Sequence, residues 1–241
     1  MKFIEKLAKR NNNMLEEKPV TIAFLGDSVT QGCFELYMEG ENGFNTVFEP
    51  QNSYVENVKR ILQYLFPMAQ INVINAGISG GNTDSALKRI DRDVIKFLPD
   101  LTVVCLGTND CTAGIDGLQE YLDNLKSIFE KLNNVGTEIV FLTPHTINDH
   151  VSKKIQSKVL IDLAEQFAKN NSEGVVDCYY DNAKRVCKEY NVKVCDCYSI
   201  WKNLNKKGVN TTELLCNQLN HPSREMHWLF AHELVKTFFE D

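Results

Sequence analysis

The stretch TIAFLGDSVTQG (residues 21–32) predicts a buried strand that ends beside a serine. Residues 22–25 form a short apolar run, and Gly26 interrupts it before Asp27 and Ser28. A serine at the carboxyl end of a strand in an open α/β sheet lies at the edge where such folds bind ligands. If a helix begins nearby, its free N–H groups and its dipole favour negative charge there. This setting suits a serine nucleophile, because its reaction with an acyl group develops an oxyanion.

The composition is typical of a globular protein. The chain has 241 residues, of which 43% are hydrophobic and 24% are charged, and this suits one α/β domain over residues 1–241. The formal net charge of −6 argues against nucleic acid as the main partner, because phosphate binding needs a basic face. No run approaches the ~18 apolar residues of a membrane span, so none is expected.

The first residues predict a short amphipathic helix rather than a secretory signal. MKFIEKLAKRNNN has neither an apolar core nor a small-residue cleavage site, and its apolar positions 3, 4, 7 and 8 share one helical face within residues 1–15. We therefore interpret the eight cysteines as reduced thiols and expect a cytoplasmic location.

Strand-like and helix-like segments alternate along the chain. Strands are expected at residues 20–25, 71–74, 101–106, 138–142 and 192–195, and helices at 53–66, 83–97, 118–132, 151–168, 175–190 and 222–239. Residues 33–51 show no clean periodicity and are expected to form a long loop beside Ser28. The alternation predicts a parallel sheet with helices on both faces and right-handed crossovers.

Four segments at strand ends or near the end of the chain each offer a different chemical group. They are GDSVTQG (26–32), NAGISGGN (75–82), LGTND (106–110) and LNHP (219–222). Ser28 offers a hydroxyl, Gly80 an unobstructed backbone N–H, Asn109 an amide donor and His221 a base. A nucleophile, a base and oxyanion donors together predict an acyl-transfer site.

In the same order along the chain, these segments resemble the four sequence blocks of the SGNH (GDSL) hydrolases. The resemblance implies a flavodoxin-like, three-layer α/β/α sandwich around a five-stranded parallel sheet. It also implies a serine esterase with Ser28 as nucleophile, His221 as base, and an oxyanion hole formed by Ser28, Gly80 and Asn109. No metal or organic cofactor is expected. The expected substrate is a small-molecule ester with a short acyl group, such as an O-acetyl group on a carbohydrate.

One position departs from the family pattern. The family usually has an aspartate three residues before the histidine, and this chain has Gln218 there. A backbone carbonyl could orient His221 in a Ser–His dyad, Gln218 or Asn217 could act as a neutral acceptor, or an acid could come from elsewhere. The missing carboxylate also motivates a different hypothesis, a catalytically impaired binding module. A thioesterase or a lysophospholipase would use the same machinery as the esterase.

Ser79 is the rival nucleophile. GISGG (77–81) matches G-x-S-x-G, the nucleophile elbow of α/β-hydrolases, and it lies between an expected strand and helix. Only two strands precede Ser79, however, and no HGG-type oxyanion segment lies upstream, so Ser28 is favoured. We interpret Asp27 and Asp110 as structural acceptors that hold their loops.

Overall fold

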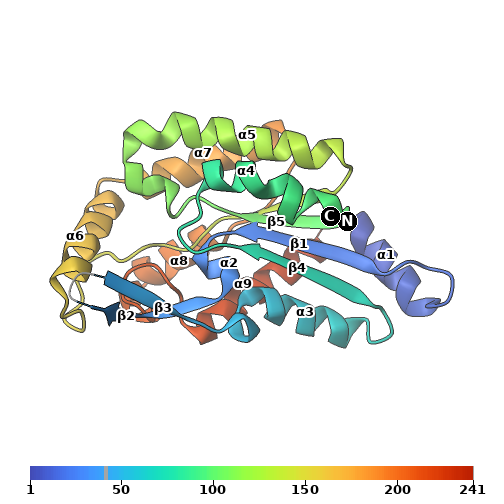
Figure 1. Cartoon of the computed structure of the whole chain (residues 1–241), viewed down its shortest axis with the longest axis horizontal. Helices are drawn as coiled ribbons and strands as arrows, with labels where there is room; N and C mark the ends of the chain where they lie inside the picture. The colour runs from blue at the N-terminus through green and yellow to red at the C-terminus, as the bar shows by residue number, and fades with distance from the viewer. Residues whose placement is uncertain (41–42, 241) are drawn as a thin grey trace.

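The computed structural model describes residues 1–40 and 43–240. At its centre is a parallel sheet of five strands in the order β4-β1-β5-β6-β7 (Figure 1). The strands are β1 (Val20–Gly26), β4 (Ile71–Gly77), β5 (Leu101–Cys105), β6 (Glu138–Leu142) and β7 (Lys193–Cys195). Every residue of β5 is buried, as expected for a central strand covered on both faces. The predicted fold class is confirmed.

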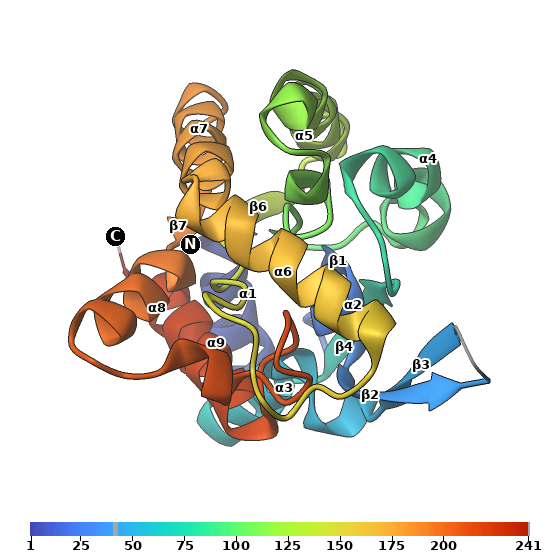
Figure 2. The ribbon, with the colours of Figure 1, turned by 90° about the vertical axis from the view of Figure 1, so that its left-hand side faces the viewer.

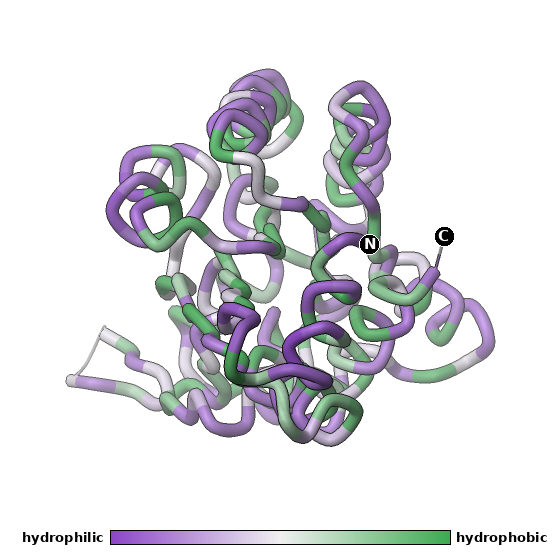
Figure 3. The backbone as a smooth tube through the Cα atoms, turned by 90° about the vertical axis from the view of Figure 1, so that its right-hand side faces the viewer, coloured by the Kyte–Doolittle hydropathy of each residue, from purple (hydrophilic) through white to green (hydrophobic). Residues whose placement is uncertain are grey.

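Helices cover both faces of this sheet (Figures 1 and 2). One face packs against α4 (Thr83–Asp93), α5 (Leu118–Asn134) and α7 (Val175–Glu189), and α6 (Lys158–Ser172), which crosses the end of the sheet, adds Ala164 and Phe167 to the same core. The other packs against α1 (Lys2–Asn12), α3 (Tyr54–Leu65), α8 (Cys197–Lys206) and α9 (Arg224–Phe239). In Figure 3 the helices alternate between hydrophilic and hydrophobic segments, because each turns one stripe toward the sheet.

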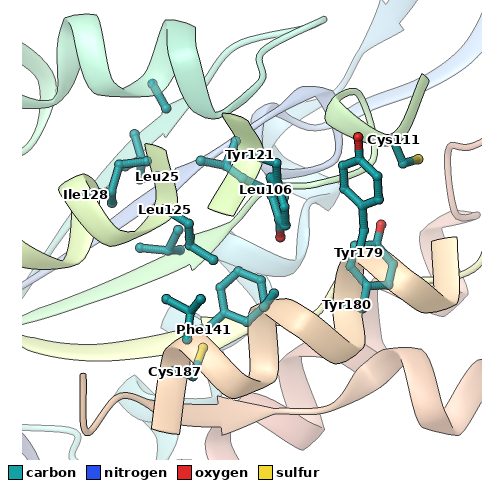
Figure 4. Close-up of a cluster of buried hydrophobic side chains, with 14 of the residues drawn as sticks. Leu25, Leu106, Cys111, Tyr121, Leu125, Ile128, Phe141, Tyr179, Tyr180 and Cys187 are labelled. Carbon is teal, nitrogen blue, oxygen red and sulfur yellow. The ribbon is translucent and has the colours of Figure 1, made fainter. Parts of the chain in front are cut away.

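Alternate residues of β1 enter two separate cores. Ala23 and Leu25 pack on the face covered by α5 and α7, while Ile22 and Phe24 pack on the opposite face. Figure 4 shows Leu25 in the first of these cores. A strand buried on both faces reads as a continuous apolar run, which is why residues 22–25 predicted it correctly.

The segment expected to be a long loop is instead mostly a β-hairpin, so that prediction is wrong. Strands β2 (Cys33–Glu39) and β3 (Gly43–Phe48) pair antiparallel, with an irregularity of register between Cys33 and Leu36. A two-stranded ribbon that is partly exposed on both faces has little need for alternating polarity, which explains the weak pattern. Residues 41 and 42 lie outside the described residues.

The helix expected at residues 151–168 is also displaced. Residues 151–157 precede α6, where Ile155 N–H bonds to the Ser152 carbonyl in a turn, and the helix runs on to Ser172. Helix α8 was not predicted, although the Asp196 carboxylate caps it by accepting from Ser199 N–H. The helix expected from residue 222 begins at Arg224, because Pro222 pairs with Leu215 in an isolated bridge.

Candidate active site

Ser28 lies where β1 gives way to the short helix α2 (Ser28–Gln31). Asp27 is the N-cap of this helix, and its carboxylate accepts a hydrogen bond from Val29 N–H at 2.9 Å. Ser28 is therefore the first helical residue, where backbone N–H groups have no partner within the helix and favour negative charge. The strand-end setting anticipated for Ser28 is the one observed.

His221 is brought to Ser28 across nearly the whole chain. Its Nε2 lies 3.0 Å from Ser28 Oγ, and its Nδ1 lies 2.7 Å from the backbone oxygen of Phe34, the second residue of β2. A carbonyl oxygen can only accept, so Nδ1 carries the proton and Nε2 presents its lone pair to the serine hydroxyl. This is the arrangement of a general base beside a nucleophile.

The acceptor for the His221 ring is a backbone carbonyl rather than a side chain of the 217–221 loop. Asn217 Oδ1 instead accepts the backbone N–H groups of residues 219, 220 and 221, which shapes the loop. Gln218 donates its amide to Leu215 O at 2.7 Å, and Gln218 Oε1 is buried with no hydrogen-bond partner among the described residues. The structure thus places neither side chain against the imidazole.

Burial controls the charge of the base. Removal from water lowers the pKa of His221, and the Phe34 carbonyl and the Glu35 carboxylate act in the opposite direction. Because burial is the largest of these influences, the ring is held neutral, as a base must be before it takes a proton.

The expected oxyanion donors line the same cavity as Ser28 and His221, a space of about 500 Å³ that also includes Gly80 and Asn109. Gly80 adopts φ +73°, a conformation that favours glycine, and no acceptor for its N–H is found in residues 1–40 and 43–240. Asn109 donates one amide N–H to Gly81 O at 2.8 Å, and the amide carries a second N–H.

Ser79 also lines the cavity, but the hydrogen bonds of the His221 ring go to Ser28 and Phe34. The Ser79 backbone N–H is tied to Gln31 Oε1 at 2.6 Å. The geometry therefore favours Ser28 over Ser79 as the nucleophile.

Buried Arg89 and half-buried Asp110 hold the elements behind the cavity together. Arg89 donates to Ala76 O at 2.7 Å and to Gly26 O at 2.9 Å, which joins β4 to β1. Asp110 accepts from the backbone N–H of Thr83 at 2.9 Å.

Burial raises the pKa of Asp27 to about 7, and the nearby charge of Asp110 acts in the same direction.

The walls of the cavity come from the segment expected beside Ser28, residues 33–51, and from helix α6, which the sequence did not connect with the site. The hairpin contributes Leu36, Phe44, Asn45, Thr46 and Phe48, and helix α6 contributes Leu163, Gln166 and Phe167. In Figure 2, α6 crosses the end of the sheet from which the hairpin extends. The irregular pattern of residues 33–51 pointed to the first of these walls, and no signal in the sequence marked the side chains of α6.

Within residues 1–40 and 43–240, no helix has both the length and the hydropathy needed to cross a bilayer. The same described part of the chain holds no group of three or more His, Cys, Asp or Glu side chains arranged to bind a metal ion.

A parallel α/β sheet with a Ser–His pair and amide donors at its carboxyl edge defines a class of acyl-transferring hydrolases. Residues 24–229 match the GDSL-like Lipase/Acylhydrolase family, and the chain belongs to this family. The predicted family is confirmed.

Relatives of this chain include several carbohydrate esterases. An acetylxylan esterase of Geobacillus stearothermophilus is 31% identical over 135 residues, which cover 52% of this chain and 60% of the relative. The solved structure of Axe2, an acetylxylan esterase from the same organism, has a TM-score of 0.63 at 23% identity and covers 92% of this chain and 95% of its own. A two-domain esterase active on acetylated mannans has a TM-score of 0.66 at 19% identity, covering 99% of this chain and 54% of its own.

Solved variants of Axe2 described as catalytic mutants replace a serine, an aspartate or a histidine by alanine, and that aspartate precedes the histidine by three residues. These likenesses support the fold found here.

Proposed function

We propose that this protein is a serine esterase that removes O-acetyl groups from carbohydrates. The observation that carries the proposal is the 3.0 Å contact of Ser28 Oγ with His221 Nε2, in a cavity that also holds Gly80 and Asn109. The same four residues supply a nucleophile, a base and oxyanion donors.

The reaction begins when Ser28 Oγ attacks the ester carbonyl and His221 Nε2 takes the hydroxyl proton. The N–H groups of Ser28 and Gly80 and the Asn109 amide stabilise the oxyanion of the tetrahedral intermediate. When this intermediate collapses, the C–O bond to the alcohol breaks and His221 returns the proton to the leaving oxygen. Water, deprotonated by His221, then attacks the acyl-enzyme and releases the carboxylic acid and Ser28.

An acetylated carbohydrate suits both the relatives and the cavity. The relatives act on acetylated xylans and mannans by their descriptions. The cavity combines aromatic side chains, Phe44 and Phe48, with amides and hydroxyls such as those of Asn45 and Thr46. Aromatic faces pack against the apolar faces of a ligand, and a few polar groups fix its orientation.

The proposed site lacks a carboxylate at the usual place. Gln218 precedes His221 by three residues, the spacing of the aspartate and histidine in the Axe2 variants. The Phe34 carbonyl takes over the orientation of the ring, so we propose a working Ser–His dyad rather than an impaired binding module.

Kinetics with p-nitrophenyl acetate, p-nitrophenyl octanoate, acetyl-CoA and acetylated xylo-oligosaccharides test this function. We expect turnover of the two acetyl esters, loss of turnover and of fluorophosphonate labelling in Ser28→Ala, and retention of both in the matched control Ser79→Ala. Preference for octanoate or for the thioester would instead indicate a lysophospholipase or a thioesterase. No turnover and no labelling of the wild-type protein would indicate a binding module.

We also propose a cytoplasmic location and no nucleic-acid partner. The location is supported by eight free cysteines, of which Cys195 and Cys197 have sulfur atoms 4.0 Å apart, beyond the length of a disulfide. The formal net charge of −6 disfavours nucleic acid. Cell fractionation and binding to labelled DNA and RNA test these two points.

A further inference from the structure

We propose that Arg224, Glu35 and Glu49 form a clamp that positions the Phe34 carbonyl on His221, and that Glu35 supplies the negative charge that Gln218 lacks. Arg224 and Glu35 are thus positioning residues for the dyad. The inference rests on the proposed function, because it concerns the same base.

The clamp is built around one guanidinium group. Arg224 Nη1 and Nη2 donate to the two carboxylate oxygens of Glu35 at 2.6 and 3.0 Å. Its Nε and Nη2 donate to the two carboxylate oxygens of Glu49 at 2.7 Å each. A planar guanidinium that holds two carboxylates in this way has little orientational freedom.

The same guanidinium holds both residues that flank the critical peptide unit. The carbonyl of Phe34 and the N–H of Glu35 belong to one planar peptide group. The guanidinium carbon of Arg224 lies 4.4 Å from the centre of the Phe34 ring, while the guanidinium bonds to the Glu35 side chain. On the hairpin, Thr46 Oγ1 donates to Glu35 O at 3.1 Å. Contacts on both residues of this peptide group, Phe34 and Glu35, therefore fix the direction of the Phe34 carbonyl.

The clamp also connects the acceptor to the base. Arg224 follows His221 by three residues, and Pro222 between them pairs with Leu215. Helix α9, which carries Arg224, and the loop that carries His221 thus form a continuous support. A shift of the hairpin relative to α9 would move the Phe34 carbonyl away from His221 Nδ1. The hydrogen bonds of Arg224 to Glu35 resist this shift, because they join α9 to the hairpin.

The charges around His221 favour Glu35 as the source of electrostatic support. Hydrogen bonding to Arg224 lowers the pKa of Glu35, so this carboxylate is ionised at neutral pH. Burial lowers the pKa of the neighbouring His145 and His227 to about 3 and raises that of Cys216 to about 12, so these three groups carry no charge. The clamp holds one positive and two negative charges, and of these the Glu35 carboxylate acts to raise the pKa of His221.

The position three residues before His221 offers a direct test. Gln218 has φ +60°, a conformation in which Asp and Asn are accepted more readily than most residues. Gln218→Asp restores a carboxylate at the usual family position, and Gln218→Asn is the matched control without charge. Both Gln218 variants are made in the wild-type protein and in Glu35→Gln. The Glu35→Gln change keeps the shape of the Glu35 side chain and removes its charge.

The measurements are kcat/KM for p-nitrophenyl acetate between pH 4 and 9, and the titration of His221 by ¹⁵N NMR, assigned with His221→Asn. We expect Glu35→Gln to lower kcat/KM about tenfold and to move the acid limb and the His221 titration to lower pH, by about one pH unit. Arg224→Lys, which keeps the charge but cannot make the paired contacts, should lower kcat with little change in KM.

The decisive comparison is between the two backgrounds. When Gln218→Asp is added to the Glu35→Gln variant, kcat/KM should rise to within about threefold of the wild-type value. When it is added to the wild-type protein, kcat/KM should rise much less. Gln218→Asn should rescue neither. If Glu35→Gln left both the acid limb and the His221 titration unchanged, or if Gln218→Asp benefited both backgrounds equally, the proposal would be overturned. Should the wild type hydrolyse no ester, the proposed function fails, while the NMR titration still decides on the clamp.

Discussion

The N-cap of the nucleophile helix should make the protein less stable as the pH rises. Asp27 is 1% exposed, and burial raises its pKa to about 7 from an ordinary value of 3.8. Between these two values the folded chain holds a proton at Asp27 that the unfolded chain has lost. The contribution of this group to stability is therefore complete below pH 3.8 and is lost as the pH rises through about 7.

The magnitude follows from the pKa difference. One pKa unit corresponds to about 1.4 kcal/mol, so the interval from 3.8 to about 7 corresponds to about 4 kcal/mol. Asp27→Asn keeps a good N-cap, since Asn caps helices as well as Asp does, and it never ionises. The free energy of unfolding of the variant minus that of the wild type should therefore increase by about 1.4 kcal/mol per pH unit between pH 4 and 7, then level off.

Urea denaturation followed by circular dichroism at a series of pH values measures this difference. The same change at Asp123, whose side chain is exposed, controls for the loss of one carboxylate. A difference that stayed constant from pH 4 to 8 would refute the reasoning, because it would mean that Asp27 titrates alike in the folded and unfolded chains. A second readout is catalytic, because ionisation of Asp27 places a buried negative charge on the residue next to Ser28, where the proposed reaction develops an oxyanion. Wild-type kcat/KM should fall above pH 7, and that of Asp27→Asn should not.

Three further substitutions test the site and its supports. Asn109→Ala should lower kcat by about 10²–10³ with little change in KM, as for other oxyanion donors, and steady-state kinetics measure this. Arg89→Leu leaves two buried strand-end carbonyls without a donor and should lower the free energy of unfolding by about 2–4 kcal/mol in urea titrations. Gly77→Ala would place a methyl group 2.3 Å from Gln31 N, so its melting temperature should fall, by an amount equivalent to about 1–3 kcal/mol. Wild-type values in any of these would contradict the corresponding assignment.

The parallel sheet could be predicted because each of its strands carries a local signal. An inner strand is almost entirely apolar, and its end is marked by glycine or by a polar loop, as at Gly26 and Gly107. The rule that parallel strands present their carboxyl ends at one edge then gathers Ser28, Gly80 and Asn109 into one site without further information.

The acceptor for His221 could not be predicted, since it is a carbonyl 187 residues away in sequence. A backbone carbonyl is present at every position, so it carries no residue-type signature. Its strand belongs to a hairpin that does not join the main sheet, and its pattern therefore lacked the alternation of a half-buried strand. Among the three alternatives for the orienting group, the carbonyl is the one that the structure places on the ring.

A carbonyl in place of a carboxylate changes the balance between the two tasks of His221. In the proposed dyad, a neutral acceptor on Nδ1 stabilises the imidazolium less than a carboxylate there would. Burial also lowers the pKa of the ring more than Glu35 raises it, so His221 is a weaker base toward Ser28. The same imidazolium is a stronger acid toward the leaving oxygen. A sugar alkoxide is a poor leaving group that needs this proton, whereas p-nitrophenolate leaves without it. The proposed dyad therefore suits esters of ordinary alcohols better than its missing carboxylate suggests. Its weaker base slows the attack of Ser28, but its stronger acid speeds the departure of the alcohol and offsets part of that loss.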